Sequence, residues 1–159
     1  MSSGRCAVSS MHLSLSTANC LLACGDSMQS DFERLVTLAR AARKNAYAPY
    51  SHYAVGAAVL AKSGKIYAGC NIENAAYPSA MCAERVAIYK AAAEGERALV
   101  AVAVVTSNLG SPCGACRQVL AEFADDDAVI ILAPARGRRR KRFTMKQILP
   151  DRFGAKHLR

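Results

Sequence analysis

Three cysteines stand at the starts of two predicted helices, and the fold must bring these starts together if the three act jointly. Cys82 opens an Ala-rich helical pattern that stops at Gly95, and Cys113 and Cys116 open another after Pro112. A Cys-x-x-Cys pair can bind one metal ion with both sulfurs, and a third thiolate from a separate element leaves tetrahedral zinc one ligand short. The spacing therefore predicts that both helix starts converge on one open metal site.

A carboxylate follows the first cysteine at a distance that suits proton transfer. Glu84 lies two residues after Cys82, so it can reach a water at the open metal position without binding the metal. Arg85 comes next, and a guanidinium that donates to a cysteine sulfur would offset the charge of three thiolates on Zn²⁺. A structural zinc site uses four protein ligands and needs no acid beside it. The arrangement favours hydrolytic chemistry.

Two other interpretations of the cysteines stay open at this point. Cys113-Gly114-Ala115-Cys116 alone matches a thioredoxin-like redox pair, although Cys82 and Glu84 have no role in such a protein. Cys70 could serve as a fourth ligand and close a structural zinc site, which would leave Glu84 unexplained.

Hydrophobic periodicity and turn residues predict alternating strands and helices after an initial hairpin. The expected elements are a helix from Ser30 to about Asn45, strands over 53–60 and 66–70, a helix over 82–94, a strand over 99–105, a helix over 113–123, strands over 129–132 and 143–144, and a helical turn over 145–149. This order predicts an α/β fold: a three-layer α/β/α sandwich with a mixed five-stranded sheet. Helices that follow strands in such a sheet can begin at one edge, where the cysteines would meet.

Length and composition indicate one globular domain. The chain has 159 residues, of which 52% are apolar, and it contains no apolar run of the roughly 18 residues that a membrane span needs. We expect a single catalytic domain over residues 28–159. Residues 1–27 lack a sustained hydrophobic period. We expect them to be either a disordered extension or upstream sequence that is not translated because synthesis starts at Met28. Seven scattered cysteines favour a reducing, cytoplasmic location, while organelle targeting by the extension stays open.

The net charge of +9 has a local origin. Residues 136–142 contain five arginines and one lysine, so they supply six of the nine net positive charges. A nucleic-acid-binding face usually gathers basic residues from several elements. We therefore expect a solvated loop, and binding of nucleic acid through Arg136 to Arg142 stays open as the less favoured interpretation.

Several motifs in order along residues 30–155 resemble the cytidine deaminase family, in its small homotetrameric form with three cysteine ligands to zinc. The motifs are Tyr50-Ser51-His52-Tyr53-Ala54-Val55-Gly56, Gly69-Cys70-Asn71-Ile72-Glu73-Asn74, Cys82-Ala83-Glu84-Arg85, Ser111-Pro112-Cys113-Gly114-Ala115-Cys116-Arg117-Gln118 and Leu149-Pro150. The resemblance implies one Zn²⁺ per subunit and hydrolytic deamination of cytidine and 2′-deoxycytidine to uridine and 2′-deoxyuridine, with release of ammonia, in pyrimidine salvage.

The resemblance also implies roles for particular residues. Cys82, Cys113 and Cys116 would hold zinc, Glu84 would move protons, and Arg85 would support the cysteine sulfurs. The substrate would be bound by residues from several segments: Asn71 and Glu73 at the ribose 3′-hydroxyl, the Ala83 N–H and the Ser111 carbonyl at the base edge, Tyr53 and Phe153 stacked on the pyrimidine, and Tyr77 at an interface.

In the resembling family, Phe153 would reach in from a neighbouring subunit, so active sites would be shared within a homotetramer. Two positions depart from the family pattern: Tyr53 stands where Phe is usual and Ala54 where Pro is frequent. The Tyr53 hydroxyl needs a hydrogen-bond partner. Two alternative functions on the same fold are deamination of a modified cytosine nucleoside of the blasticidin type, which Asn71 and Glu73 disfavour, and an RNA-binding or editing protein.

Overall fold

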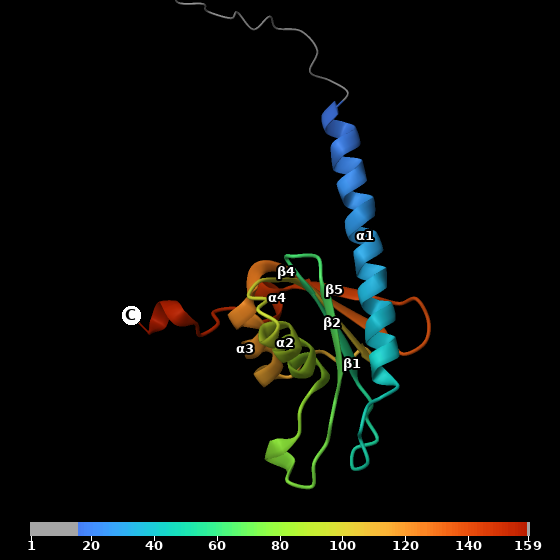
Figure 1. Ribbon diagram of the computed structural model, residues 1–159, viewed down its shortest axis with the longest axis vertical. Helices are drawn as coiled ribbons and strands as arrows, with labels where there is room; N and C mark the ends of the chain where they lie inside the picture. Colours follow the sequence, from blue (N-terminus) through green and yellow to red (C-terminus); the bar gives the residue numbers. More distant parts are fainter. Residues whose placement is uncertain (1–15, 159) are drawn as a thin grey trace, which may run out of the picture. The chain divides into compact units, whose positions relative to one another are not determined.

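A five-stranded mixed sheet in the order β2-β1-β3-β4-β5 forms the centre of the molecule (Figure 1). The structure is a computed structural model that describes residues 16–158, with side chains described from Met28 onward. The elements are α1 Ser16–Arg43, β1 Gly56–Ala61, β2 Ile66–Cys70, η1 Tyr77–Ser79, α2 Ala83–Ala93, β3 Leu99–Thr106, α3 Gly114–Phe123, β4 Ala124–Pro134, β5 Lys141–Thr144, α4 Met145–Ile148 and η2 Ala155–His157. None of the described helices has the length and apolar character that a bilayer-spanning helix needs.

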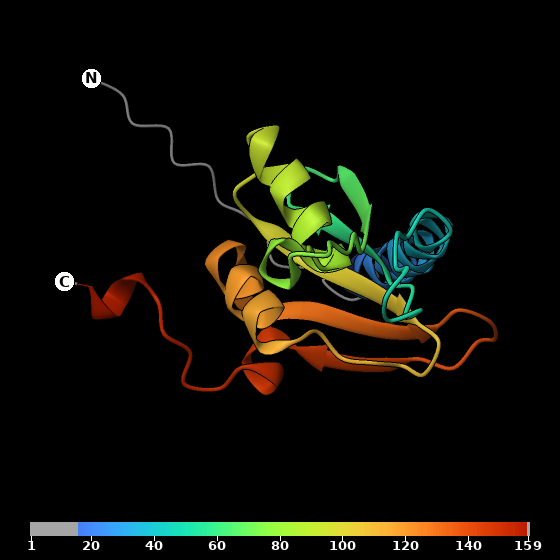
Figure 2. The ribbon, with the colours of Figure 1, turned by 90° about the horizontal axis from the view of Figure 1, so that it is seen from below.

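Alternating side chains of the strands build two apolar layers, one on each face of the sheet. On one face, Val59, Val102 and Leu132 pack with buried residues of α2, α3 and α4. On the other face, their neighbours in sequence pack against residues 32–39 of α1. Figure 2 shows α2 and α3 on one side of the sheet and the part of α1 from Asp31 onward on the other. The predicted α/β/α sandwich with a mixed five-stranded sheet is therefore confirmed.

The prediction that the first helix begins at Ser30 was wrong, because α1 begins at Ser16. Residues 16–30 contain no proline, and their single glycine, Gly25, costs only about 1 kcal/mol in a helix. The division of the chain into two units, Met1–Ser30 and Asp31–Arg159, falls within this helix. The first 15 positions of the predicted 1–27 extension lie outside the described residues.

Several strand boundaries differ from the prediction, and the two largest differences have identifiable reasons. β1 begins at Gly56 instead of Tyr53, because the Asn71 side chain accepts from the Val55 N–H and donates to the Tyr53 carbonyl in place of a neighbouring strand. β4 begins at Ala124, well before the predicted 129, because residues 125–128 bulge out opposite Val100 and the ladder resumes at Val129.

Strand direction determines which helices begin at the same edge of the sheet. β1 is antiparallel to both β2 and β3, so β2 and β3 run in the same direction. The helix α2 is the first α-helix after β2 and α3 is the first after β3, so both helices follow strands that end at one edge. β1 starts at that edge, where Gly56 pairs with Cys70 and with Val105. At this edge, therefore, β2 and β3 end and β1 begins.

Candidate active site

The sulfur atoms of Cys82, Cys113 and Cys116 all lie within 4.8 Å of one another. Cys82 is the N-cap of α2 and Cys113 is the N-cap of α3, while Cys116 lies in the first turn of α3. Neither N-cap side chain forms a capping hydrogen bond. The partial positive charge of two helix N-termini favours thiolates at these positions.

The thiols of Cys82 and Cys116 differ in their pKa. The pKa of Cys82 is lowered to about 5, first because the Cys116 thiol donates a hydrogen bond to it and then because of Arg85. The same contact with Cys82 raises the pKa of Cys116. The proton of this pair therefore stays on Cys116, and the negative charge rests on Cys82 beside the Arg85 Nη2, 3.5 Å away.

Glu84 is placed beside the sulfurs and is almost fully enclosed. It lies in the first turn of α2, and its side chain is 4% exposed. Burial raises its pKa above the ordinary 4.5, and the negative charge of Cys82 raises it further. A carboxyl group in this environment holds a proton more readily than an exposed glutamate does.

A pocket of about 270 Å³ opens above these groups. Its lining residues are Ser51, Tyr53, Val55, Asn71, Glu73, Cys82, Ala83, Glu84, Val104, Thr106, Gly110, Ser111 and Cys113. One cavity therefore contains two of the three predicted metal ligands, Glu84 and five of the seven predicted substrate residues. Its size suits a small molecule better than a polymer strand.

Two predicted ribose-binding side chains are held in place by backbone groups of the segment before β1. The Glu73 carboxylate accepts hydrogen bonds from the N–H groups of Tyr50 and Ser51 and from the Ser51 hydroxyl. These bonds, the hydroxyl first, lower the pKa of Glu73 below its ordinary value of 4.5. Asn71 uses its amide oxygen for the Val55 N–H and its amide nitrogen for the Tyr53 carbonyl. The amide oxygen and the amide nitrogen of Asn71 can each form one more hydrogen bond.

The structure does not bring two of the predicted residues into this pocket. Tyr77 lies in η1 and lines a neighbouring pocket that shares Ser51 and Glu73 with it, and its ring meets the Tyr50 ring edge-on at 6.1 Å. Phe153 is 58% exposed and stacks on His157, with its carbonyl accepting from the Gln118 side chain. Both aromatic side chains are available to a second molecule.

Comparison with known proteins agrees with this geometry. Residues 29–132 match the family model of the cytidine and deoxycytidylate deaminase zinc-binding region. A cytidine deaminase from Sporosarcina psychrophila is 46% identical over 130 residues, which are 80% of this chain and 95% of that protein. The chain belongs to the cytidine deaminase family. The crystal structure of cytidine deaminase from Burkholderia pseudomallei superimposes with a TM-score of 0.71 at 42% identity, and covers 76% of this chain and 98% of that one.

The residues present fit the zinc ion that this family's zinc-binding region implies. Three cysteine sulfurs form a soft donor set of the kind that zinc prefers, and no further His, Cys, Asp or Glu among the described residues completes the group to four. Cys70 donates instead to the Asn45 carbonyl at 3.3 Å, so it does not close the site. A three-ligand site agrees with the cytidine deaminase family and disfavours both a closed structural site and a simple redox pair.

Three residues that shape the pocket of this cytidine deaminase family member were not predicted from the sequence. Thr106, the last residue of β3, and Asn108, two residues after it, form hydrogen bonds in the loop that leads to Ser111. Arg117 donates to the Pro112 carbonyl, the Ile148 carbonyl and the Ser111 hydroxyl, so it fixes the loop from the side of α3. Arg117 was visible within a recognised motif, but the sequence offered no signal for its partners.

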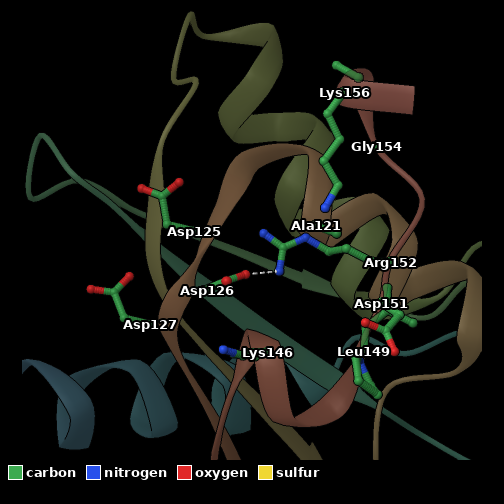
Figure 3. A pocket seen from close by; sticks show the side chains of 12 residues that line it. Ala121, Asp125, Asp126, Asp127, Lys146, Leu149, Asp151, Arg152, Gly154 and Lys156 are labelled. Atoms are coloured by element: carbon green, nitrogen blue, oxygen red, sulfur yellow. Dashed lines mark hydrogen bonds and ion pairs between the residues drawn. The ribbon is translucent and has the colours of Figure 1, made fainter. Parts of the chain in front are cut away.

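A larger cavity, of about 740 Å³, contains none of the predicted site residues. Figure 3 shows its lining, in which Arg152 and Asp126 form an ion pair while Asp125 and Asp127 point away from Arg152. This ion pair fastens the C-terminal segment to β4 next to Phe153. The cavity therefore lies where the C-terminal segment meets β4 and α4.

The arginine-rich turn between β4 and β5 has two kinds of side chains. Arg140 pairs with Glu33 at 3.2 Å, and the Arg142 guanidinium lies 5.2 Å from the centre of the Phe32 ring, so both dock on α1. Arg136, Arg138 and Arg139 are exposed. Part of the basic run therefore stabilises the contact between the turn and α1.

Proposed function

We propose that this protein catalyses hydrolytic deamination of cytidine and 2′-deoxycytidine to uridine and 2′-deoxyuridine, with release of ammonia. The observation that supports the proposal most strongly is that Glu84 is buried in the same pocket that two of the three clustered cysteines line. The cytidine deaminases among its relatives add support at 45–46% identity over 80% of the chain.

In this proposal Cys82, Cys113 and Cys116 hold zinc, with Arg85 donating to the Cys82 sulfur. Zinc in such a site supplies a water nucleophile that is acidic enough to react at neutral pH. Because three thiolates carry one negative charge more than the ion neutralises, the guanidinium and the two helix N-termini offset the excess.

Glu84 performs the proton transfers. Its carboxylate takes one proton from the attacking water and delivers it to the pyrimidine ring nitrogen. It then takes the second proton of that water, from the hydroxyl added to the ring carbon, and passes it to the departing amine. The cycle consumes one water and releases one ammonia, so Glu84 returns to its starting state. Burial, which raises the pKa of this carboxyl, suits a group that must both accept and donate.

The remaining pocket residues select and align the nucleoside. The Ala83 N–H and the Ser111 carbonyl face the base edge, Asn71 and Glu73 bind the ribose 3′-hydroxyl, and Tyr53 stacks on the base. Buried polar groups that lose their partners penalise a substrate without the sugar. We therefore expect free cytosine to react far more slowly than cytidine.

We also propose that residues 28–159 form the catalytic domain and that it acts in the cytoplasm in pyrimidine salvage as a homotetramer. Two exposed aromatics support assembly: Tyr77 is 73% exposed and Phe153 is 58% exposed, although both are large and apolar. If each copy inserted its Phe153 into the pocket of a neighbouring copy, every pocket would gain one aromatic wall.

The test is turnover of cytidine, 2′-deoxycytidine, cytosine and a cytosine-containing oligonucleotide, with ammonia and zinc content measured together. Both nucleosides should react, and chelation of zinc should stop the reaction. Glu84→Gln, which keeps the size of the buried side chain, should retain zinc and lose at least about a thousandfold in kcat, because one group serves two proton transfers. A Glu84→Gln protein with wild-type kcat, or wild type that deaminates only the oligonucleotide, would refute the proposal.

A further inference from the structure

Tyr53 forms hydrogen bonds both through its backbone carbonyl and through its side-chain hydroxyl. Its carbonyl accepts from the Asn71 side chain at 2.9 Å, and its hydroxyl donates to the Asn108 Oδ1 at 2.6 Å. Asn71 follows β2, whereas Asn108 follows β3. The ring therefore spans one wall of the pocket, from the segment before β1 to the loop between β3 and α3.

The loop that receives the Tyr53 hydroxyl is built around two further hydrogen bonds. The Thr106 hydroxyl accepts from the Gly110 N–H at 2.7 Å and lies 3.4 Å from the Asn108 Oδ1, to which it can donate. Leu109, between them, has a φ of 62°, a left-handed conformation that residues with a branched side chain rarely adopt. A strained loop of this kind keeps its shape only where neighbouring groups hold it.

Gly110 fits closely against the Tyr53 hydroxyl. A Cβ atom at this position would lie 2.5 Å from the Tyr53 hydroxyl oxygen and 3.3 Å from the Asn108 Oδ1. The hydroxyl thus covers the backbone of the residue directly before Ser111, and both Gly110 and Ser111 line the pocket. Arg117, in α3, donates to the Ser111 hydroxyl at 3.0 Å.

We propose that the Tyr53 hydroxyl and Asn108 form a positioning pair that fixes the loop 107–111 against the pocket and thereby aligns the Ser111 carbonyl during the reaction. The inference rests on the proposed deamination and deepens it. The hydroxyl is not needed for stacking, because a phenyl ring stacks equally well. It is also not needed to satisfy a buried group, because Asn108 is exposed to solvent. Its remaining role is to hold the loop.

The experiment compares Tyr53→Phe, Asn108→Leu and the double variant in zinc-loaded protein. Each single change should lower kcat by about 3- to 10-fold, the usual effect of losing one hydrogen bond, with a smaller change in KM. The double variant should be no slower than either single variant, because both remove the same bond. Asn108→Asp keeps the acceptor oxygen and should recover most of the activity that Asn108→Leu loses.

A matched control is Tyr67→Phe, which removes a hydroxyl that donates to Glu94 at 3.1 Å outside the pocket. It should leave kcat and KM unchanged. Hydrogen exchange of the loop gives a readout that does not depend on turnover: the Gly110 amide should exchange faster in Tyr53→Phe and Asn108→Leu than in wild type.

Three results would overturn the inference: wild-type kcat in Tyr53→Phe, additive losses in the double variant, or faster exchange without a change in kcat. Inactive wild-type protein would refute the proposed function instead, and the exchange comparison would still show whether the pair holds the loop.

Discussion

Helix α1 approaches β1 so closely at Gly56 that any side chain there would collide with it. A Cβ atom built on Gly56 would lie 2.0 Å from the Ala39 carbonyl oxygen, 2.6 Å from the Arg43 nitrogen and 2.7 Å from the Arg43 Cβ. Two of these neighbours are backbone atoms, which cannot rotate away. Gly56→Ala therefore tests whether α1 packs on this face of the sheet as described.

The size of the effect follows from the distances. The contact with the Ala39 carbonyl falls about 1.4 Å short of the 3.4 Å at which ordinary contact begins, so α1 or the strand must move. Movement would loosen a layer in which Leu35, Val36 and Ala39 are 0–1% exposed. Overpacking of a core costs roughly 1–3 kcal/mol, and a backbone collision belongs at the upper end of that range or above it. We expect a loss of about 3 kcal/mol, or a Tm lower by about 6–12 °C.

Urea unfolding followed by circular dichroism measures this loss, with two other glycines as controls. Gly154 has a φ of −166°, and a Cβ placed on it would meet no atom within 4 Å, so Gly154→Ala should match wild type. Gly64 also has free space but a φ of +88°, so Gly64→Ala should cost about 1–2 kcal/mol from backbone strain alone. A Gly56→Ala protein that unfolds at the wild-type urea concentration would refute the packing of α1 against β1.

Two further changes test the supports of the pocket. A lysine at position 117 cannot reach the Pro112, Ile148 and Ser111 acceptors together, so Arg117→Lys should destabilise the protein by about 1–3 kcal/mol and lower kcat/KM. The control Arg97→Lys, on an exposed turn, should change neither quantity. Equal unfolding curves for wild type and Arg117→Lys would contradict the role of the Arg117 guanidinium. The pKa of Glu73 is lowered in the folded state, so its contribution to stability is complete above 4.5 and is lost as the pH falls through the folded-state pKa. The stability difference between wild type and Glu73→Gln should therefore shrink in acid, and a constant difference in unfolding titrations would argue against these hydrogen bonds.

The sequence was sufficient to predict the elements whose signal is local. The strand over 66–70 was predicted at its observed bounds, and α2, α3 and β3 to within one residue at each end, because hydrophobic runs and the residues that end them are adjacent in sequence. The start of β1 was missed because a distant asparagine side chain satisfies the backbone of Tyr53 and Val55. The start of α1 was missed because residues 16–30 show a helix without an apolar period.

The same distinction between local signals and partners distant in sequence applies to the residues of the site. The metal-ligand cysteines and Glu84 stand next to helix starts, so their spacing alone predicted that they could meet. Asn108 and Thr106 could not be found in this way, because their importance depends on a hydroxyl 55 residues away in sequence from Asn108 and on a loop conformation. The family resemblance pointed to Tyr53 as a departure, and the structure supplies the partner that its hydroxyl needs.

The register of three strands explains why groups so distant in sequence share one pocket. Gly56, at the start of β1, pairs with Cys70 at the end of β2 and with Val105 near the end of β3. Residues just before Gly56 and just after Cys70 and Val105 must then emerge together at the sheet edge, about 5 Å from strand to strand. Tyr53, Asn71 and Asn108 are those residues: Tyr53 and Asn108 each lie three positions from the paired residue, and Asn71 lies one position from it. A slip of one residue in either pairing would turn side chains to the opposite face and separate the Tyr53 ring from both of its partners, so the apolar layers that fix the register also fix the pocket.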